Sequence, residues 1–142
     1  MTDRYLYRAK RTDNGEWVEG CLLIIDDSEY RIATSCLQGD VNEILTVCAY
    51  EVDQSTICQC TGLNDKNGKL IFENDIVKFD VYEYEKLVSS TVSEIKWCEE
   101  LCSLSVVVNK QGIRGTLGHF LDLNKEVEVI GSAIDNPELL EK

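Results

Sequence analysis

The feature that most constrains the fold of this chain is the regular spacing of its turn-forming residues. Short runs rich in β-branched and aromatic residues alternate with turn-forming residues about every ten positions. Examples of such runs are Trp17–Leu23, Ile44–Val52 and Val127–Gly131. The pairs Asn14–Gly15 and Asn67–Gly68 are typical of tight turns, since glycine adopts a positive φ at low steric cost. The sequence therefore predicts a mainly β fold with little helix, in which short antiparallel strands form a small barrel or sandwich.

Two segments qualify this prediction. The charged stretch Val81–Ser90 fits either a strand pair or a helical turn. Near the end of the sequence, Asn136 is a candidate N-cap and Pro137 suits the first helical position, so one helical turn is expected there.

The length of 142 residues fits one domain spanning 1–142. Within it we expect room for two lobes, the N-terminal hairpins of residues 1–57 and a barrel-like part of residues 58–142 that contains an SH3-like element. That element is suggested by the tight turn before Asp75 and the alternating strand after it.

Charge and hydropathy narrow the possible partners and the location. The chain has 14 basic and 26 acidic residues, a formal net charge of -12, which disfavours binding to duplex nucleic acid. It contains no apolar segment of signal-peptide type and no apolar run of about 18 residues, so we expect a cytoplasmic protein of a bacterial cell without a membrane contact. In that compartment its seven cysteines are expected to be reduced.

Candidate metal and catalytic groups are few. Cys58, Cys60, Cys98 and Cys102 could offer four thiolates to zinc, but their spacing fits buried inert thiols better, and the sequence leaves open whether the two pairs approach each other. His119 is the single histidine and is interpreted as structural. We therefore expect no catalytic residue, no metal and no cofactor.

A glycine-rich run, Gly112–Gly118, could cradle a phosphate with help from Arg114. It lacks the following helix and the Gly-Lys-Ser/Thr motif that a phosphate loop needs, which favours an ordinary hairpin loop.

The most acidic part of the chain is residues 72–100. Its carboxylates could form a solvated surface, but they could also steer a basic protein partner, and four of them are predicted contact residues: Glu83, Glu85, Glu99 and Glu100. Trp17 and Trp97 lie in strand-like runs and are both predicted to be anchors of the core.

Three segments together resemble the YopX-like proteins of bacteriophages and prophages. They are the basic opening Arg8–Gly20, the long central motif Cys60–Lys78, and the C-terminal segment from Val129 to Leu140. In this chain Asn74 replaces a usual glycine, and asparagine tolerates the same left-handed backbone. Residues 132–134, Ser-Ala-Ile, also differ from the usual Asn-Ile-Tyr.

The resemblance implies a mostly β fold over nearly the whole chain and brings no established activity with it. Its motif positions are interpreted as scaffold, since each has turn or strand chemistry: Trp17, Gly62, Asp65, Gly68, Asp75, Gly131 and Pro137.

We expect a phage- or prophage-derived accessory protein that binds another protein, such as a host factor, or assembles with itself. One alternative is a small carboxylate-dependent hydrolase, with or without Mg²⁺. The other is a single-stranded nucleic-acid module with a local basic edge and stacking tyrosines, formed by Arg4, Arg8, Lys10, Arg11, Arg31, Tyr5 and Tyr7.

Overall fold

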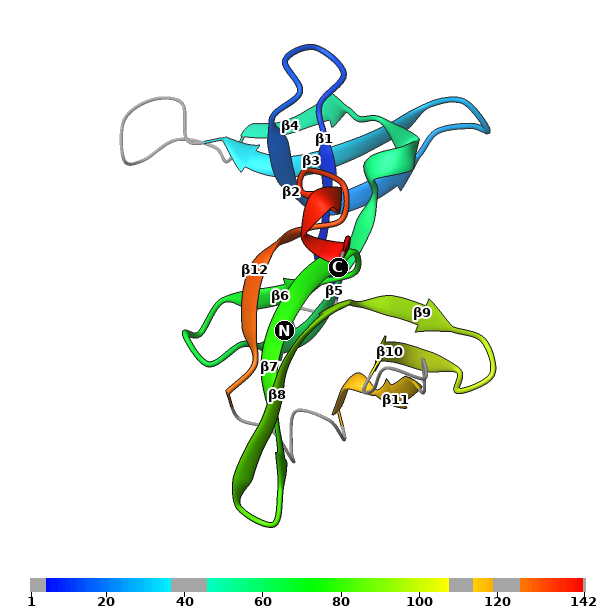
Figure 1. Cartoon of the computed structure of the whole chain (residues 1–142). Coiled ribbons are helices and arrows are strands. Elements are labelled where there is room, and N and C mark those ends of the chain that lie inside the picture. Colours follow the sequence, from blue (N-terminus) through cyan, green and yellow to red (C-terminus); the bar gives the residue numbers. More distant parts are fainter. Residues whose placement is uncertain (1–4, 37–45, 108–113, 119–125, 142) are drawn as a thin grey trace. The chain divides into compact units, whose positions relative to one another are not determined.

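The computed structural model of the chain describes residues 5–36, 46–107, 114–118 and 126–141 (Figure 1). Its internal contacts divide it into two compact units, Met1–Cys60 and Thr61–Lys142, called unit 1 and unit 2 below.

Unit 1 is built from antiparallel strands in the spatial order β4-β3-β2-β1-β5. Its elements are β1 (Tyr7–Lys10), β2 (Trp17–Ile24), β3 (Tyr30–Cys36), β4 (Thr46–Glu51), the short 3-10 helix η2 (Gln54–Thr56) and the start of β5 (Cys58–Asn64). Ala9, Ile32 and Val52 are buried at its centre, with half-buried side chains such as Tyr7 and Leu22 packed around them. Alternate residues of each strand supply this core because successive side chains point to opposite faces.

Local chemistry fixes the first hairpin of unit 1. Gly15 has a φ of 71° in the turn between β1 and β2, as the Asn-Gly pair predicts. Gly20 lies where β2 passes close to β3, and a Cβ there would be 2.1 Å from the carbonyl oxygen of Ala33. Glycine is therefore required at position 20 by the approach of the neighbouring strand.

Unit 2 contains two three-stranded antiparallel sheets, in the orders β12-β7-β8 and β11-β10-β9, and β6 lies next to β5. Its elements are β6 (Leu70–Phe72), β7 (Asp75–Glu83), β8 (Lys86–Glu94), β9 (Lys96–Cys98), β10 (Ser103–Val107), β11 (Arg114–Thr116), β12 (Glu128–Ser132) and the 3-10 helix η3 (Pro137–Leu140). One apolar cluster fills it, consisting of Ile71, Val77, Phe79, Ile95, Val106, Leu117, Val127 and Val129.

The prediction of a mainly β chain with short antiparallel strands and little helix is confirmed. The sheets traced by the described residues form no closed barrel, since each has edge strands. The ambiguous stretch Val81–Ser90 is a strand pair, with Glu83 opposite Lys86. The strands β8 and β9 follow each other directly and are separated by Ile95 alone.

In the part of the chain that the structure covers, no helix has the length and apolar character needed to cross a membrane.

Candidate functional site: two acidic hairpin tips

The central motif is held by the carboxylate of Asp65. Its Oδ1 accepts hydrogen bonds from the backbone N–H groups of Asn67 and Lys69, both at 2.9 Å, and its Oδ2 accepts one from Val129 at 3.0 Å. Burial acts to raise the pKa of Asp65, but the three N–H donors and the charge of Lys69 outweigh it, so the pKa lies below its usual value. Gly68 completes the turn with a φ of 80°.

A second carboxylate, Asp75, is fully buried at the start of β7. Its Oδ2 accepts a hydrogen bond from the N–H of Phe72 at 2.8 Å, and Asn74 beside it has a φ of 68°. Asn74 thus adopts the left-handed conformation expected where the YopX-like pattern has glycine. Both carboxylates bind backbone N–H groups, which is chemistry that shapes turns.

The C-terminal motif encloses Gly131. A Cβ at Gly131 would lie 2.7 Å from Oδ1 of Asn136 and 3.0 Å from Leu139. A larger residue at position 131 would therefore clash with Asn136 and with η3. Pro137 is the first residue of η3, as expected. Asn136 occupies the N-cap position of η3, as expected, but its side chain makes no capping bond there, and its Oδ1 instead accepts a hydrogen bond from the N–H of Ser132 at 3.3 Å.

The remaining motif residues are Gly62, which has a φ of 76° in β5, and Trp17, which is half-buried in β2. Trp17 is flanked by cations, with the Arg8 guanidinium 4.7 Å and the Lys10 ammonium 5.4 Å from its ring centroid.

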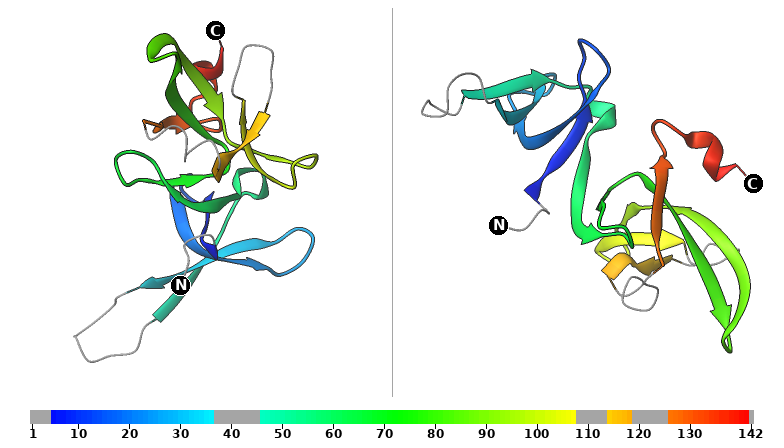
Figure 2. Two further views of the ribbon diagram at one scale, coloured as in Figure 1. Left: turned by 90° about the horizontal axis from the view of Figure 1, so that it is seen from below. Right: turned by 90° about the vertical axis from the view of Figure 1, so that its left-hand side faces the viewer.

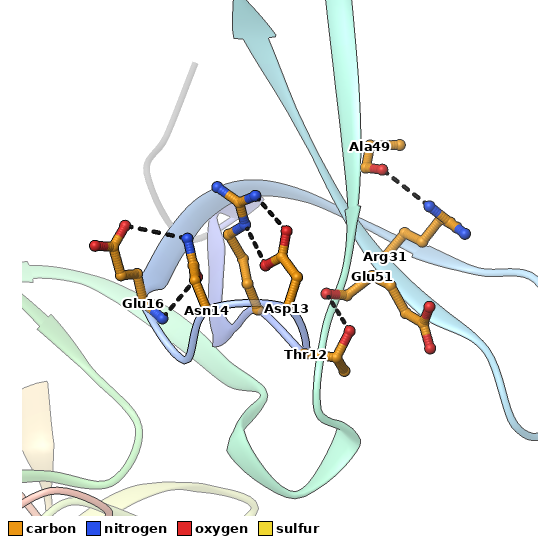
Figure 3. A network of polar contacts seen from close by, with 8 residues as sticks. Thr12, Asp13, Asn14, Glu16, Arg31, Ala49 and Glu51 are labelled. Carbon is orange, nitrogen blue, oxygen red and sulfur yellow. Dashed lines mark hydrogen bonds and ion pairs between the residues drawn. The ribbon is translucent and has the colours of Figure 1, made fainter.

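The other basic residues of unit 1 also have internal partners. Arg11 lies 4.0 Å over the ring of Tyr50 and makes two hydrogen bonds to Asp13. Figure 3 shows Asp13 on the β1–β2 turn and, on the neighbouring strands, Arg31 donating to the carbonyl oxygen of Ala49 at 3.0 Å. Arg31 also contacts Glu29 at 2.7 Å. The proposed basic edge is therefore occupied by contacts within unit 1 wherever it is described, and Arg4 lies outside the described residues.

The predicted acidic contacts lie on two hairpin tips of unit 2. The β7–β8 tip (residues 83–87) contains Glu83 and Glu85, and the β9–β10 tip (residues 97–102) contains Glu99 and Glu100. Figures 1 and 2 show the two tips as separate protrusions of the unit. The structure thus brings the four residues together as two pairs, although the position of the Glu83 side chain is outside what it describes.

Each tip also exposes large apolar side chains that the sequence did not point to as contacts. At the β7–β8 tip the side chain of Tyr84 is 99% exposed and that of Leu87 is 58% exposed. At the β9–β10 tip Trp97 is 55% and Leu101 is 41% exposed. The prediction that Trp97 anchors the core is wrong, because β9 lies at the edge of its sheet and its paired partner Leu104 packs against the core instead.

The carboxylates of these tips are available to solvent. Glu85, Glu99 and Glu100 are exposed, and none forms an ion pair with another residue that the structure describes. Each tip therefore presents negative charge beside apolar area, a combination suited to a protein surface that carries basic and apolar groups.

The cysteines assemble no metal centre in the described ranges, where no group of three or more His, Cys, Asp or Glu side chains could hold a metal ion. Cys58 and Cys60 are buried on β5, Cys98 is half-buried, and Cys102 is exposed. Cys48 on β4 is disulfide-bonded, so the expectation of fully reduced cysteine is wrong at that position.

Two other sequence candidates are only partly described. His119 lies outside the described residues. In the glycine-rich run, residues 112 and 113 are also outside them, while Arg114–Thr116 is strand β11, which corrects the interpretation of that part as loop.

Comparisons with known proteins agree with this fold. A family model described as YopX protein matches residues 6–141. The X-ray crystal structure of protein yopX from Bacillus subtilis is similar with a TM-score of 0.61, covering 96% of this chain and 98% of that chain at 21% identity. Among curated proteins no sequence match was found.

Proposed function

Since the chain belongs to the YopX family, whose function is uncharacterised, we propose that it is a non-enzymatic module that binds another protein through the two acidic hairpin tips. The partner presents a basic surface. A bacterial host factor is the candidate partner, and self-assembly is less favoured because it would bring together two chains of formal net charge -12. The chain acts in the cytoplasm as a phage or prophage accessory protein.

One observation carries this proposal: both tips expose a large aromatic side chain, Tyr84 or Trp97, beside exposed carboxylates. Exposed aromatic residues are enriched among those that contribute most to binding energy at protein interfaces. The carboxylates around them raise the association rate with a basic partner and disfavour acidic ones.

The alternatives have less support. The buried carboxylates Asp65 and Asp75 accept hydrogen bonds from backbone N–H groups, so these two described acids serve turns and are poorly placed to act as an acid and base pair of a hydrolase. For single-stranded nucleic acid, the cations of Arg8, Lys10 and Arg11 lie over aromatic rings of unit 1, which leaves them poorly placed to follow a phosphate backbone.

The test begins with the full chain as bait in host lysate, followed by kinetic measurement with the recovered partner at several ionic strengths. In a variant with Glu83, Glu85, Glu99 and Glu100 changed to Gln, we expect a slower association at low salt and a weaker salt dependence.

A second variant controls for total charge by neutralising four acidic residues of unit 1, with Glu16→Gln, Glu19→Gln, Asp27→Asn and Glu51→Gln. It should associate faster than the tip variant at equal net charge. Failure to recover any partner, together with a strictly monomeric chain, would overturn the proposal. Equal rates for the two variants would show that the tips do not make the contact.

A further inference from the structure

The β7–β8 hairpin has an unfavourable turn at its tip. Glu83 pairs with Lys86, so Tyr84 and Glu85 form a two-residue loop. Their φ angles are 50° and 66°. Two positive φ angles are characteristic of the type I′ turn, in which Asn-Gly is the preferred pair because bulkier side chains crowd the backbone there.

Two other turns of the chain follow the usual rule, whereas Cys102 in the β9–β10 turn, with a φ of 48°, is a further non-glycine residue at positive φ. The β1–β2 turn has Gly15 and the central motif has Gly68 at positive φ, each preceded by asparagine. Tyrosine and glutamate at the β7–β8 tip therefore depart from the turn chemistry of the β1–β2 turn and the central motif.

Burial of Tyr84 against the described residues of unit 2 does not offset that departure. Its side chain is 99% exposed, so it contributes almost no burial. The hairpin also extends beyond its sheet: β12 pairs with β7 only up to Lys78, and from Phe79 to Glu83 the described pairing partner of β7 is β8 alone. Figures 1 and 2 show this twisted ribbon projecting from the unit.

We propose that Tyr84 is the anchor of the partner contact, and that it binds a basic protein segment in which an apolar side chain is flanked by lysine or arginine. This inference rests on the proposed function and names the residue and the partner chemistry. Tyr84 and the exposed Leu87 supply the apolar contact. Glu85 next to Tyr84 supplies the charge that the flanking basic residues meet. Tyr84 has a strained backbone conformation although its side chain is exposed. Backbone strain of this kind is found at sites where function requires a particular side chain.

The test uses a library of random 12-residue peptides displayed on phage, selected against the immobilised full chain. The enriched peptides should contain an aromatic or aliphatic residue flanked by Lys or Arg. Synthetic copies should bind Tyr84→Ser at least about tenfold more weakly than wild type, the size of effect expected for an aromatic anchor. Tyr5→Ser is the matched control, since Tyr5 is a 59% exposed tyrosine of unit 1. Its binding should match wild type.

A double variant, Tyr84→Asn with Glu85→Gly, separates binding from folding. It keeps the two-residue loop and relieves the backbone strain, so its melting temperature should rise while peptide binding is lost. A melting temperature at or below that of wild type would overturn the argument from strain.

Enriched peptides that bind Tyr84→Ser as well as wild type, enriched peptides without basic residues, or no enriched peptide would each overturn the inference. Peptides that depend on Trp97 and not on Tyr84 would overturn it while supporting the proposed function. The lysate experiment described above decides the proposed function independently.

Discussion

The carboxylate of Asp65 accepts a hydrogen bond from the backbone N–H of Val129, which lies 64 residues further along the chain, over a distance of 3.0 Å. The same carboxylate holds Asn67 and Lys69 in the turn before β6. A backbone bond from the N–H of Lys66 to the carbonyl oxygen of Val127, at 2.9 Å, lies next to this contact. One side chain thus connects the central motif to β12, where the chain returns to the core of unit 2.

Asp65→Asn should lower the free energy of unfolding by about 1.5–3 kcal/mol, because a neutral amide accepts these bonds less well and turns its NH₂ group toward N–H donors. Urea denaturation measures this. Asp53→Asn is the control, since exposed Asp53 makes similar local bonds to Ser55 and asparagine is an equally good cap; its effect should be within about 0.5 kcal/mol. Equal effects of the two variants would contradict the role of Asp65.

The stability of the chain should fall in acid partly through Asp65. Its pKa is lower in the folded than in the unfolded chain, so the unfolded state binds more protons and protonation favours unfolding. The contribution is fully present above the unfolded pKa of ~4 and is lost as the pH falls below that value through the folded pKa. Urea denaturation from neutral pH down to about pH 3 should therefore show that the free energy of unfolding decreases less in Asp65→Asn than in wild type. Parallel curves of unfolding free energy against pH for the two proteins would refute this prediction.

Trp97→Ser should change the free energy of unfolding by less than about 1 kcal/mol, because the side chain of Trp97 is 55% exposed. Phe79→Ala, which empties a fully buried site of the unit 2 core, should cost about 3–5 kcal/mol. Acrylamide quenching offers a second measurement, since fluorescence from Trp97 should be quenched more than that from half-buried Trp17. If Trp97→Ser instead lowers the free energy of unfolding by several kcal/mol, Trp97 is a core residue.

The cysteines should differ in their reaction with a thiol reagent. Cys21 and Cys102 are exposed and should be labelled in the native protein, whereas buried Cys58 and Cys60 should react only after unfolding. Without a reductant, Cys48 should stay unlabelled in both conditions because it is disulfide-bonded. Mass spectrometry of labelled peptides assigns each site. Labelling of Cys58 at the rate of Cys102 would contradict the burial of β5.

Turn positions were predictable from the residues because a turn depends on the φ preferences of adjacent residues. Gly15, Gly68 and Asn74 all have the positive φ that their residue types favour. The β7–β8 tip was ambiguous because Tyr84 and Glu85 lack that preference, and their conformation follows from the pairing of the strands on either side. The four glutamates of the candidate site could be named from charge alone, whereas the exposed aromatic residues beside them could not.

The sequence by itself determined that the chain is mainly β, where most strands and turns lie, and that its surface is strongly acidic, since these properties depend on neighbouring residues and on composition. Only the tertiary structure decided which strand-borne aromatic residues are buried. Trp17 and Trp97 occupy similar strand patterns, yet Trp17 is half-buried beside Arg8 while Trp97 is exposed on an edge strand. The difference arises because the face and the neighbours of a strand are set by contacts between residues far apart in the chain, such as the one joining Asp65 to Val129.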